Sequence, residues 1–210
     1  MNTTDIFADN FCSLDELIAR MKKKTKVLKS SEIEAAFVAI DRADFVRKDY
    51  KVEAYEDYPL PIGSEQTISQ PTTVAYMLEL LELEAGQTVL DVGCGSGWTT
   101  ALLAHIVGEE GRVIGVELRE ELASFGRENL SKYNLPEAEI RAGDALQGSQ
   151  PEAPFDRILV SAGAKNEVPD QLLEQLTVGG IIVVPVNNAL IKITKESEDD
   201  LEQEALPGFR

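Results

Sequence analysis

The stretch of sequence that most constrains the fold of this chain runs from Thr88 to Trp98, Thr-Val-Leu-Asp-Val-Gly-Cys-Gly-Ser-Gly-Trp. Its first part, residues 88–92, is apolar and β-branched, which predicts a buried strand. Glycine then recurs at alternate positions, Gly93, Gly95 and Gly97. A strand, a glycine loop and a following helix bring main-chain N–H groups close to a ligand. The stretch therefore predicts either a nucleotide-type cofactor site or a tight strand-to-helix turn.

The spacing of these glycines distinguishes between cofactor classes. A dinucleotide fingerprint, G-x-G-x-x-G, would place its third glycine where this chain has Trp98. A P-loop would continue with Gly-Lys-Ser or Gly-Lys-Thr, and neither follows. The G-x-G-x-G loop after Asp91 instead resembles the first motif of adenosylmethionine-dependent methyltransferases. That resemblance implies S-adenosyl-L-methionine as cofactor, with a first set of binding residues: Asp91, Gly93, Gly95, Ser96 and Gly97.

Composition narrows the class of protein further. With 210 residues and a hydrophobic fraction of 43%, we expect one domain, or one domain with a small extension. The formal net charge of −17 repels polyanions, so we expect no nucleic acid as partner. The basic run Lys22–Lys26 is interpreted as the solvated face of a helix. Cys12 and Cys94 form no C-x-x-C pair, and we predict no metal site.

The sequence also gives expectations about location. The N-terminus has no positive region followed by an apolar run, so we predict no signal peptide. No stretch approaches the ~20 apolar residues of a membrane-spanning helix. We therefore expect a soluble, cytoplasmic protein without a membrane partner.

Helices and one long irregular segment precede the glycine loop. The periodicity of apolar residues predicts three helices, at 14–24, 33–40 and 72–83. The first two follow capping-box spacings, Ser13 with Glu16 and Ser31 with Glu34. Residues 44–71 are rich in proline and without a period, which predicts a loop. A loop of this length inside a domain is uncommon unless it is functional.

From Gly86 onward strands and helices alternate. We predict five strands, at 88–92, 113–117, 139–142, 155–161 and 181–186, with 190–194 as an edge strand. Helices are predicted between them at 99–107, 119–133 and 169–176. This alternation predicts a doubly wound, mostly parallel α/β sheet of the Rossmann-like methyltransferase class, with helices on both faces. Residues 1–71 would supply the N-terminal helices and active-site loop, and 72–210 the cofactor-binding part of one unit.

Two acidic residues follow the next two strands. Glu117 ends the strand after the glycine loop, where a carboxylate accepts hydrogen bonds from both ribose hydroxyls. Asp144 follows the third strand and is placed either to accept from an adenine amino group or to cap a helix. Ligands bind at the carboxyl ends of parallel strands, so these residues and the glycine loop predict one nucleoside site.

Motifs outside the glycine loop resemble protein-L-isoaspartate O-methyltransferases. The resemblance rests first on Tyr55–Gly63 and on Gln66–Pro71, which contains Gln-Thr-Ile-Ser. Further matching segments are Gly143-Asp144, 153–156, Val168-Pro169, 172–176, Gly179-Gly180 and 184–186. The matched region extends from about Phe37 to Lys195. It implies methyl transfer from S-adenosyl-L-methionine to the free carboxylate of L-isoaspartyl residues in damaged proteins or peptides.

The resemblance also implies roles for individual residues. Ser69 matches the active-site serine and would be the catalytic residue. Cofactor contacts would further include Gln66, Thr67, Ile68, Ser69, Glu117, Leu118, Asp144 and Ala145. Substrate contacts would be made by Pro61, Ile62, Gly63 and Ser69. The expected partner is an isoaspartyl protein or peptide, and the chain is expected to be a monomer.

The chain departs from the family pattern at three places. Trp98 stands where tyrosine is usual, and Ser64-Glu65 where Tyr-Gly or a similar pair is common. A final strand of the Phe-Val-Pro-Leu kind is expected after Arg210 and is missing, so we expect 190–194 to be the sheet edge, followed by an acidic tail. This absence leaves open a cofactor-binding interaction module without turnover.

The chemistry of an ionised carboxylate fits this residue set. Such an acceptor needs no deprotonation, so alignment and exclusion of water suffice. An alcohol acceptor would need a base, most often histidine, and the only histidine, His105, is predicted to be structural. Ser69 would donate to the incoming carboxylate, cap the following helix, or do both. A related methyltransferase acting on another peptide or small-molecule carboxylate remains the alternative enzyme hypothesis.

Overall fold

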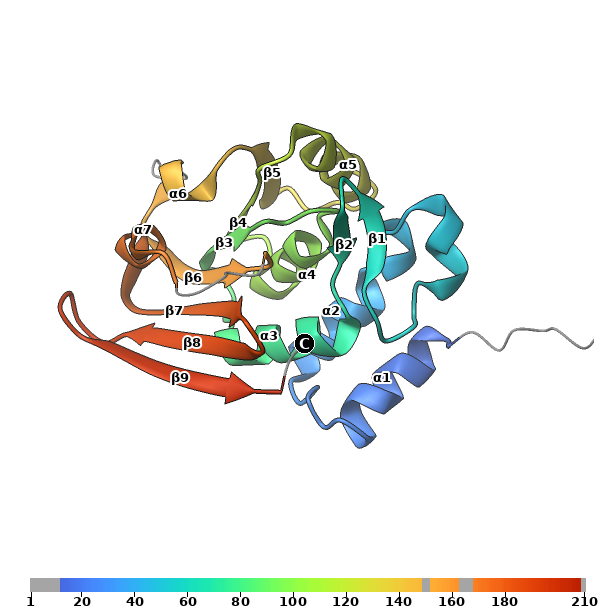
Figure 1. Cartoon of the computed structure of the whole chain (residues 1–210), viewed down its shortest axis with the longest axis horizontal. Helices are drawn as coiled ribbons and strands as arrows, with labels where there is room; N and C mark the ends of the chain where they lie inside the picture. The colour runs from blue at the N-terminus through green and yellow to red at the C-terminus, as the bar shows by residue number, and fades with distance from the viewer. Residues whose placement is uncertain (1–11, 149–151, 163–167, 209–210) are drawn as a thin grey trace, which may run out of the picture.

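A computed structural model describes residues 12–148, 152–162 and 168–208, and a seven-stranded sheet forms its centre (Figure 1). The strand order is β5-β4-β3-β6-β7-β8-β9. The first five of these strands are parallel, and β8 and β9 are added antiparallel. Their bounds are β3 Thr88–Val92, β4 Arg112–Glu117, β5 Ala138–Ala142, β6 Phe155–Val160, β7 Leu176–Val186, β8 Ala189–Lys195 and β9 Leu201–Pro207. The mostly parallel sheet confirms the predicted fold class.

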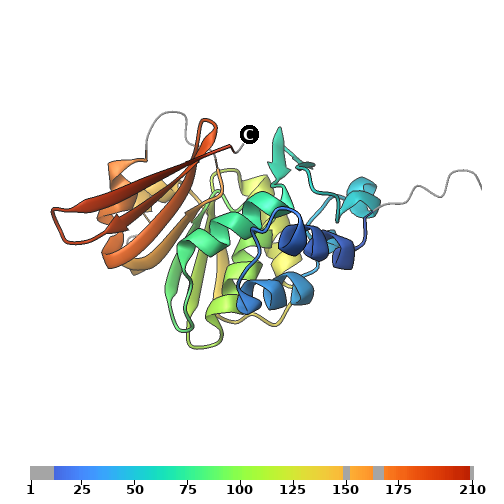
Figure 2. The same cartoon turned by 90° about the horizontal axis from the view of Figure 1, so that it is seen from below.

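Helices cover the two faces of the sheet unequally. One face packs against α3 (Pro71–Leu81), α4 (Trp98–Val107) and α5 (Glu120–Leu130), with α1 (Leu14–Lys23) and α2 (Ser31–Ala39) outside them. The other face carries the short helices α6 (Ala145–Gly148) and α7 (Asp170–Glu174). Figure 2 shows the N-terminal helices in blue on the side of the molecule away from β8 and β9, in red. Because one apolar cluster contains residues from α1 through β8, the N-terminal helices share the core of the sheet.

Local signals set the start of α1 but not of α2. The Ser13 side chain accepts from the Glu16 N–H, and the Glu16 carboxylate accepts from the Ser13 N–H, so the first capping box is confirmed. The second capping box is wrong. Ser30 is the N-cap of α2, and the Glu34 carboxylate pairs with Lys22 at 2.6 Å. The Glu34 carboxylate, which the predicted capping box required, is thus bound to Lys22 on another helix.

The segment 44–71 is more ordered than predicted. It follows the short 3₁₀ helix η1 (Arg42–Asp44) and contains η2 (Lys48–Glu53) and a hairpin of β1 (Leu60–Gly63) with β2 (Gln66–Ile68). The hairpin turns at Ser64 and Glu65, which have φ of 50° and 58°. Two successive residues with positive φ are the geometry of tight hairpin turns. Neither residue is glycine, so the turn signal was absent from the sequence.

The C-terminal third differs from the prediction at two places. β7 begins at Leu176, where a helix end and a glycine turn were expected, and Gly179 takes φ of +81° at a shift in register. The sheet also does not end at β8, because β9 pairs along its whole length. The predicted acidic tail is therefore an edge strand, joined to β8 by a turn in which the Glu196 N–H donates to Asp200 O at 2.9 Å. No helix among the described residues is long and apolar enough to span a membrane.

Candidate active site

A cavity of about 410 Å³ lies at the carboxyl ends of β3, β4, β5 and β6. The chain goes from β3 outward to β4 and β5 on one side, and β6 and β7 lie on the other, so the cavity opens at the point where the strand order reverses. Ligands of doubly wound folds bind at this point. Eight predicted cofactor residues line the cavity, together with the predicted substrate residue Ile62: Gln66, Thr67, Gly93, Gly95, Glu117, Leu118, Asp144 and Ala145.

The glycine loop forms the floor of this cavity. Gly93, Gly95 and Gly97 have φ of +75°, +52° and +85°, a backbone region that disfavours side chains. A Cβ on Gly93 would meet the Ala162 methyl at 2.6 Å, and one on Gly95 would meet Ile62 at 3.0 Å. The loop therefore brings bare main chain to the cavity, as close approach of a cofactor requires. Gly97 is the N-cap of α4 and lies outside the cavity lining.

Glu117 stands beside the glycine loop, 7% exposed. One of its carboxylate oxygens accepts from the Gly95 N–H at 3.0 Å, and the other accepts from the Arg119 N–H at 3.0 Å. A carboxylate has about four acceptor sites, so each oxygen retains capacity for one hydroxyl. Two neighbouring hydroxyls of a ribose match this arrangement. The glycine floor and the Glu117 carboxylate together fit S-adenosyl-L-methionine.

The far end of the cavity has both a polar and an apolar component. Asp144 lines it and also accepts from the Leu146 N–H at 3.0 Å, so this carboxylate both faces the cavity and caps the start of α6. The Leu118 side chain is 72% exposed at the cavity rim. An apolar side chain at a rim offers a surface for a flat base, and a carboxylate accepts from an amino group.

Asp91 lies beneath the floor and not in either cavity described here. Its side chain is 0% exposed and accepts from the hydroxyls of Thr99 at 2.6 Å, Thr100 at 2.7 Å and Ser161 at 2.8 Å. Burial raises the pKa of this carboxyl group, and the three hydroxyl donors oppose the rise. Asp91 thus orients the start of α4 and the end of β6 from below.

A smaller cavity of about 30 Å³ adjoins the first, and four residues line both. The shared residues are Thr67, Gly93, Gly95 and Ser161. Predicted site residues that line the smaller cavity but not the larger are Ile68, Ser69 and Ser96. Its described lining includes five residues that carry a hydroxyl group, and no acidic residue, lysine or histidine: Thr67, Ser69, Ser96, Thr99 and Ser161. Thr99 and Ser161 donate their hydroxyl hydrogens to Asp91, which leaves the hydroxyls of Thr67, Ser69 and Ser96 as the candidate donors to a bound anion.

Ser69 is fixed in place by Arg42. The Arg42 guanidinium, 2% exposed, donates to Ser69 O at 2.9 Å and to Tyr58 O at 3.1 Å, and its other terminal nitrogen donates to Ala54 O at 2.7 Å. Burial lowers the pKa of Arg42 to about 10, so the group remains charged at neutral pH. Its carbon Cζ lies 5.3 Å from the centre of the Trp98 ring.

The helix after Ser69 is capped by another residue. Asp57 accepts from the Thr72 N–H at 3.0 Å and from the Thr72 hydroxyl at 2.7 Å, and Gln70 occupies the N-cap position. The interpretation of Ser69 as the cap of α3 is therefore wrong. Ser69 lines the smaller cavity.

The β1–β2 hairpin docks on α5. The Arg47 guanidinium donates to Ile62 O at 2.6 Å and lies 4.3 Å from the centre of the Phe125 ring. At the tip of the hairpin the Ser64 hydroxyl donates to the Glu121 carboxylate at 3.0 Å. Ile62 thereby reaches the cofactor cavity, whereas Pro61 and Gly63, also predicted to contact substrate, lie outside both linings.

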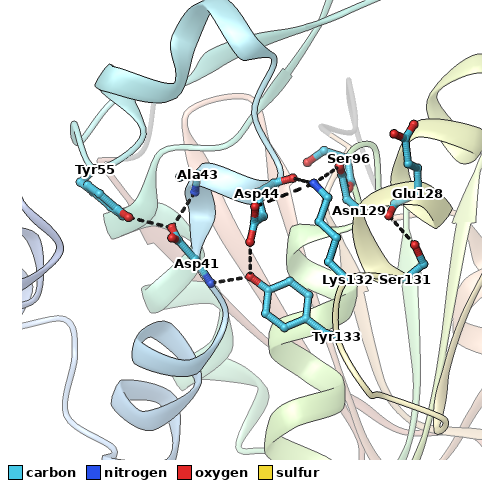
Figure 3. Close-up of polar contacts among 10 residues, drawn as sticks. All are labelled: Asp41, Ala43, Asp44, Tyr55, Ser96, Glu128, Asn129, Ser131, Lys132 and Tyr133. Atoms are coloured by element: carbon cyan, nitrogen blue, oxygen red, sulfur yellow. Dashed lines mark hydrogen bonds and ion pairs between the residues drawn. The ribbon is translucent and has the colours of Figure 1, made fainter.

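A chain of polar contacts connects the glycine loop with the segment before the hairpin (Figure 3). Asn129 donates to Ser96 O at 3.0 Å and accepts from Lys132, which also donates to Asp44 O. The Tyr133 hydroxyl donates to the Asp44 carboxylate and accepts from the Asp41 N–H, and the Asp41 carboxylate accepts from the Tyr55 hydroxyl. Neighbouring carboxylates and burial raise the pKa of Tyr55 to about 12. The end of α5 therefore ties the two sides of the site together.

Sequence reasoning missed several residues of the site. Ser161 and Ala162 follow β6 and line the cofactor cavity together with Arg119. Ser161 is the last residue of the strand predicted at 155–161 and Ala162 follows it. This position was the available signal, because the ends of neighbouring parallel strands meet at one edge. His105 is exposed in the last turn of α4 and lines neither cavity. No cluster of potential metal ligands occurs among the residues that the structure describes.

Comparison with known protein families decides between methyltransferase classes. The model of the protein-L-isoaspartate(D-aspartate) O-methyltransferase family matches residues 13–209. The chain belongs to this family. A protein-L-isoaspartate O-methyltransferase of Ignicoccus hospitalis is 44% identical over 185 residues, covering 86% of this chain and 87% of the relative. One of Methanopyrus kandleri is 46% identical and covers 83% of this chain and 76% of the relative.

Solved structures agree in fold. A Plasmodium falciparum protein described as a putative protein-L-isoaspartate O-methyltransferase, in complex with S-adenosyl-L-homocysteine, superimposes with a TM-score of 0.83 at 24% identity. The match covers 95% of this chain and 96% of that protein. Another protein-L-isoaspartate O-methyltransferase has a TM-score of 0.83 at 29% identity and covers 94% of this chain and 64% of its own.

Proposed function

We propose that this chain transfers the methyl group of S-adenosyl-L-methionine to the free carboxylate of L-isoaspartyl residues in damaged proteins or peptides. The observation that supports it most is the pair of adjoining cavities. One fits the cofactor, and the described lining of the other includes residues that carry a hydroxyl group and no acidic residue, lysine or histidine. A site that lacks a base at the acceptor suits an acceptor that arrives already ionised.

The chain's own residues divide the work between binding and alignment. Glu117 and the glycine loop hold the cofactor, whose sulfonium group supplies an electrophilic methyl. Ser69 donates a hydrogen bond to one carboxylate oxygen and directs the other toward the shared boundary of the cavities. The hairpin covers this boundary and excludes water, which strengthens these polar contacts. Alignment of this kind replaces proton abstraction as the source of rate enhancement.

Methylation serves repair through the chemistry of its product. The carbon of a free carboxylate is a poor electrophile, because attack on it would have to expel oxide or hydroxide. In the methyl ester, the main-chain nitrogen of the following residue attacks that carbon and methanol leaves, so the succinimide forms without further help from the enzyme. Hydrolysis of the succinimide restores part of the chain to ordinary aspartate. The enzyme therefore needs to recognise only the isoaspartyl carboxylate and its immediate main chain.

A methyl-transfer assay with three matched peptides tests this function. The peptides share one sequence and carry isoaspartate, aspartate or isoasparagine at the same position, the last having no free carboxylate there. We expect methyl incorporation into the isoaspartyl peptide and background levels with the other two. Equal incorporation into the aspartyl peptide would overturn the proposed substrate, and incorporation into the isoasparaginyl peptide would overturn the proposed acceptor group.

The proposal extends to the setting in which the chain works. We propose a monomer in the cytoplasm whose partners are isoaspartyl-containing proteins. Both cysteines, Cys12 and Cys94, are free thiols, which agrees with a reducing compartment. Light scattering coupled to size exclusion tests the monomer, and a dimer mass at micromolar concentration would contradict it.

A further inference from the structure

Ser161 occupies the boundary between the two cavities. It is one of four residues that line both, and two of the others are glycines without side chains. The fourth, Thr67, comes from the hairpin, on the opposite wall from the end of β6. A group that passes from the cofactor cavity to the smaller cavity crosses this boundary, which Ser161 lines.

The Ser161 hydroxyl donates its hydrogen to the Asp91 carboxylate. Its oxygen lies 2.8 Å from the Asp91 carboxylate, the same carboxylate that accepts from Thr99 and Thr100. An ionised carboxylate is an acceptor only, so each of these hydroxyls must donate to it. Hydrogen bonds in series polarise one another, and the charge on Asp91 raises the electron density on the Ser161 oxygen. Toward the cavities Ser161 consequently presents lone pairs and no proton.

An oxygen of this kind has a natural partner at the boundary. A sulfonium carries positive charge that is shared with the hydrogens of its attached carbon atoms, and such C–H groups form weak hydrogen bonds to oxygen. The neutral thioether left after methyl transfer lacks this charge. An oxygen that offers only lone pairs therefore favours the sulfonium over the thioether.

We propose that Ser161 is a further catalytic residue whose hydroxyl oxygen contacts the sulfonium end of S-adenosyl-L-methionine and aligns its methyl group with the smaller cavity, which Ser69 lines. This inference rests on the cofactor half of the proposed function and not on the identity of the acceptor. Asp91 acts through Ser161 as a positioning residue, by fixing the direction of the hydroxyl.

Binding of two cofactor forms tests the proposal without any peptide. Calorimetry gives the dissociation constants of S-adenosyl-L-methionine and S-adenosyl-L-homocysteine for the unmodified chain and for Ser161→Ala. We expect the alanine variant to weaken binding of the sulfonium form about two- to fivefold, the scale of one weak C–H···O hydrogen bond, and to leave binding of the thioether form unchanged. Equal weakening of both forms would overturn the proposal.

Thr100→Val is the matched control. Thr100 donates to the same Asp91 oxygen as Thr99, is fully buried, and lines neither cavity. We expect it to leave the ratio of the two dissociation constants unchanged. A ratio that shifts as much in Thr100→Val as in Ser161→Ala would show that the charge of Asp91, and not contact by Ser161, sets the preference, and would also overturn the proposal.

A second variant and a kinetic readout complete the test. If Ser161→Ala fails to fold, Ser161→Cys replaces the oxygen by a weaker acceptor and should shift the ratio in the same direction. Single-turnover methylation of an isoaspartyl peptide should slow in the variant that shifts the ratio. A shifted ratio with no isoaspartyl methylation by the unmodified chain would support Ser161 and refute the proposed acceptor, which separates the two claims.

Discussion

The two walls of the active site are built in different ways. The cofactor wall consists of loops at the ends of β3 and β4, where the Gly95 N–H donates to the Glu117 carboxylate. The acceptor wall consists of the β1–β2 hairpin and Ser69, which are held by charged side chains from distant positions, Arg42 above all. The first wall lies where parallel strands end together, whereas the second depends on contacts between residues far apart in the sequence. The difference predicts that substitutions will separate cofactor binding from turnover.

The largest effect on the cofactor wall is expected from Gly95→Val. A branched side chain at φ of +52° is strained and would fill the space in front of Ile62. We expect affinity for S-adenosyl-L-homocysteine to fall roughly a hundredfold or more, equivalent to about 3 kcal/mol. Calorimetry measures this loss.

Gly86→Val is the control for backbone strain. Gly86 has φ of +83° with open space around it and lies before β3, at the opposite end of the strand from the cavity. Gly86→Val should lose about as much folding stability as Gly95→Val, about 1–2 kcal/mol, and should keep its cofactor affinity. If both variants lose affinity equally, strain and not close approach explains the glycine loop.

The next largest loss of cofactor affinity is expected from Glu117→Ala. Removal of the carboxylate leaves two ribose hydroxyls and the N–H groups of Gly95 and Arg119 without their acceptor. We expect cofactor binding to weaken by about 1–3 kcal/mol. Glu139→Ala on β5, whose carboxylate pairs with Arg112 outside the cavity, should leave the affinity unchanged. Unchanged affinity in Glu117→Ala would remove this residue from the site.

The acceptor wall is tested by Arg42→Lys. A lysine has three donors on one nitrogen and cannot span the main-chain carbonyls that the guanidinium holds, so Ser69 loses its fixed position. We expect the turnover number to fall by about tenfold, a loss of roughly 1.4 kcal/mol in alignment, with cofactor affinity unchanged. Steady-state kinetics and calorimetry separate the two quantities.

Arg157→Lys supplies the comparison for Arg42. Arg157 is also buried and donates to the main-chain carbonyls of Leu81 and Glu82, and it lines neither cavity. Both variants should lower the melting temperature, but only Arg42→Lys should slow turnover. A similar loss of turnover in Arg157→Lys would mean that general loosening, and not the position of Ser69, is responsible.

The same contrast explains what the sequence could and could not predict. The strand 88–92 and the ends marked by Glu117 and Asp144 follow from local pattern, because a parallel sheet brings strand ends together whatever the details of packing. The hairpin was not predictable in this way, because neither Ser64 nor Glu65, the two residues with positive φ at its turn, signals a turn of this kind in the sequence.

Long-range contacts account for the other differences. The family resemblance located Ser69, but nothing in the local sequence showed that Arg42 would hold its carbonyl or that Asp57 would cap the helix after it. The acidic sequence of β9 predicts a solvated tail. It forms a strand because the edge of β8 is available for pairing. Ser161 was missed because a lone serine after a strand has no motif.

The pH dependence of single-turnover methylation tests most directly whether the acceptor wall aligns an ionised carboxylate without a base. With saturating isoaspartyl peptide, the rate should be nearly flat from about pH 6 to 8, since a model carboxyl group titrates near 4. Ser69→Ala should lower the rate by a similar factor at every pH, and His105→Gln should leave the profile unchanged. An inflection near pH 6.5 that disappears in His105→Gln would contradict the base-free mechanism and, with it, a carboxylate as the acceptor.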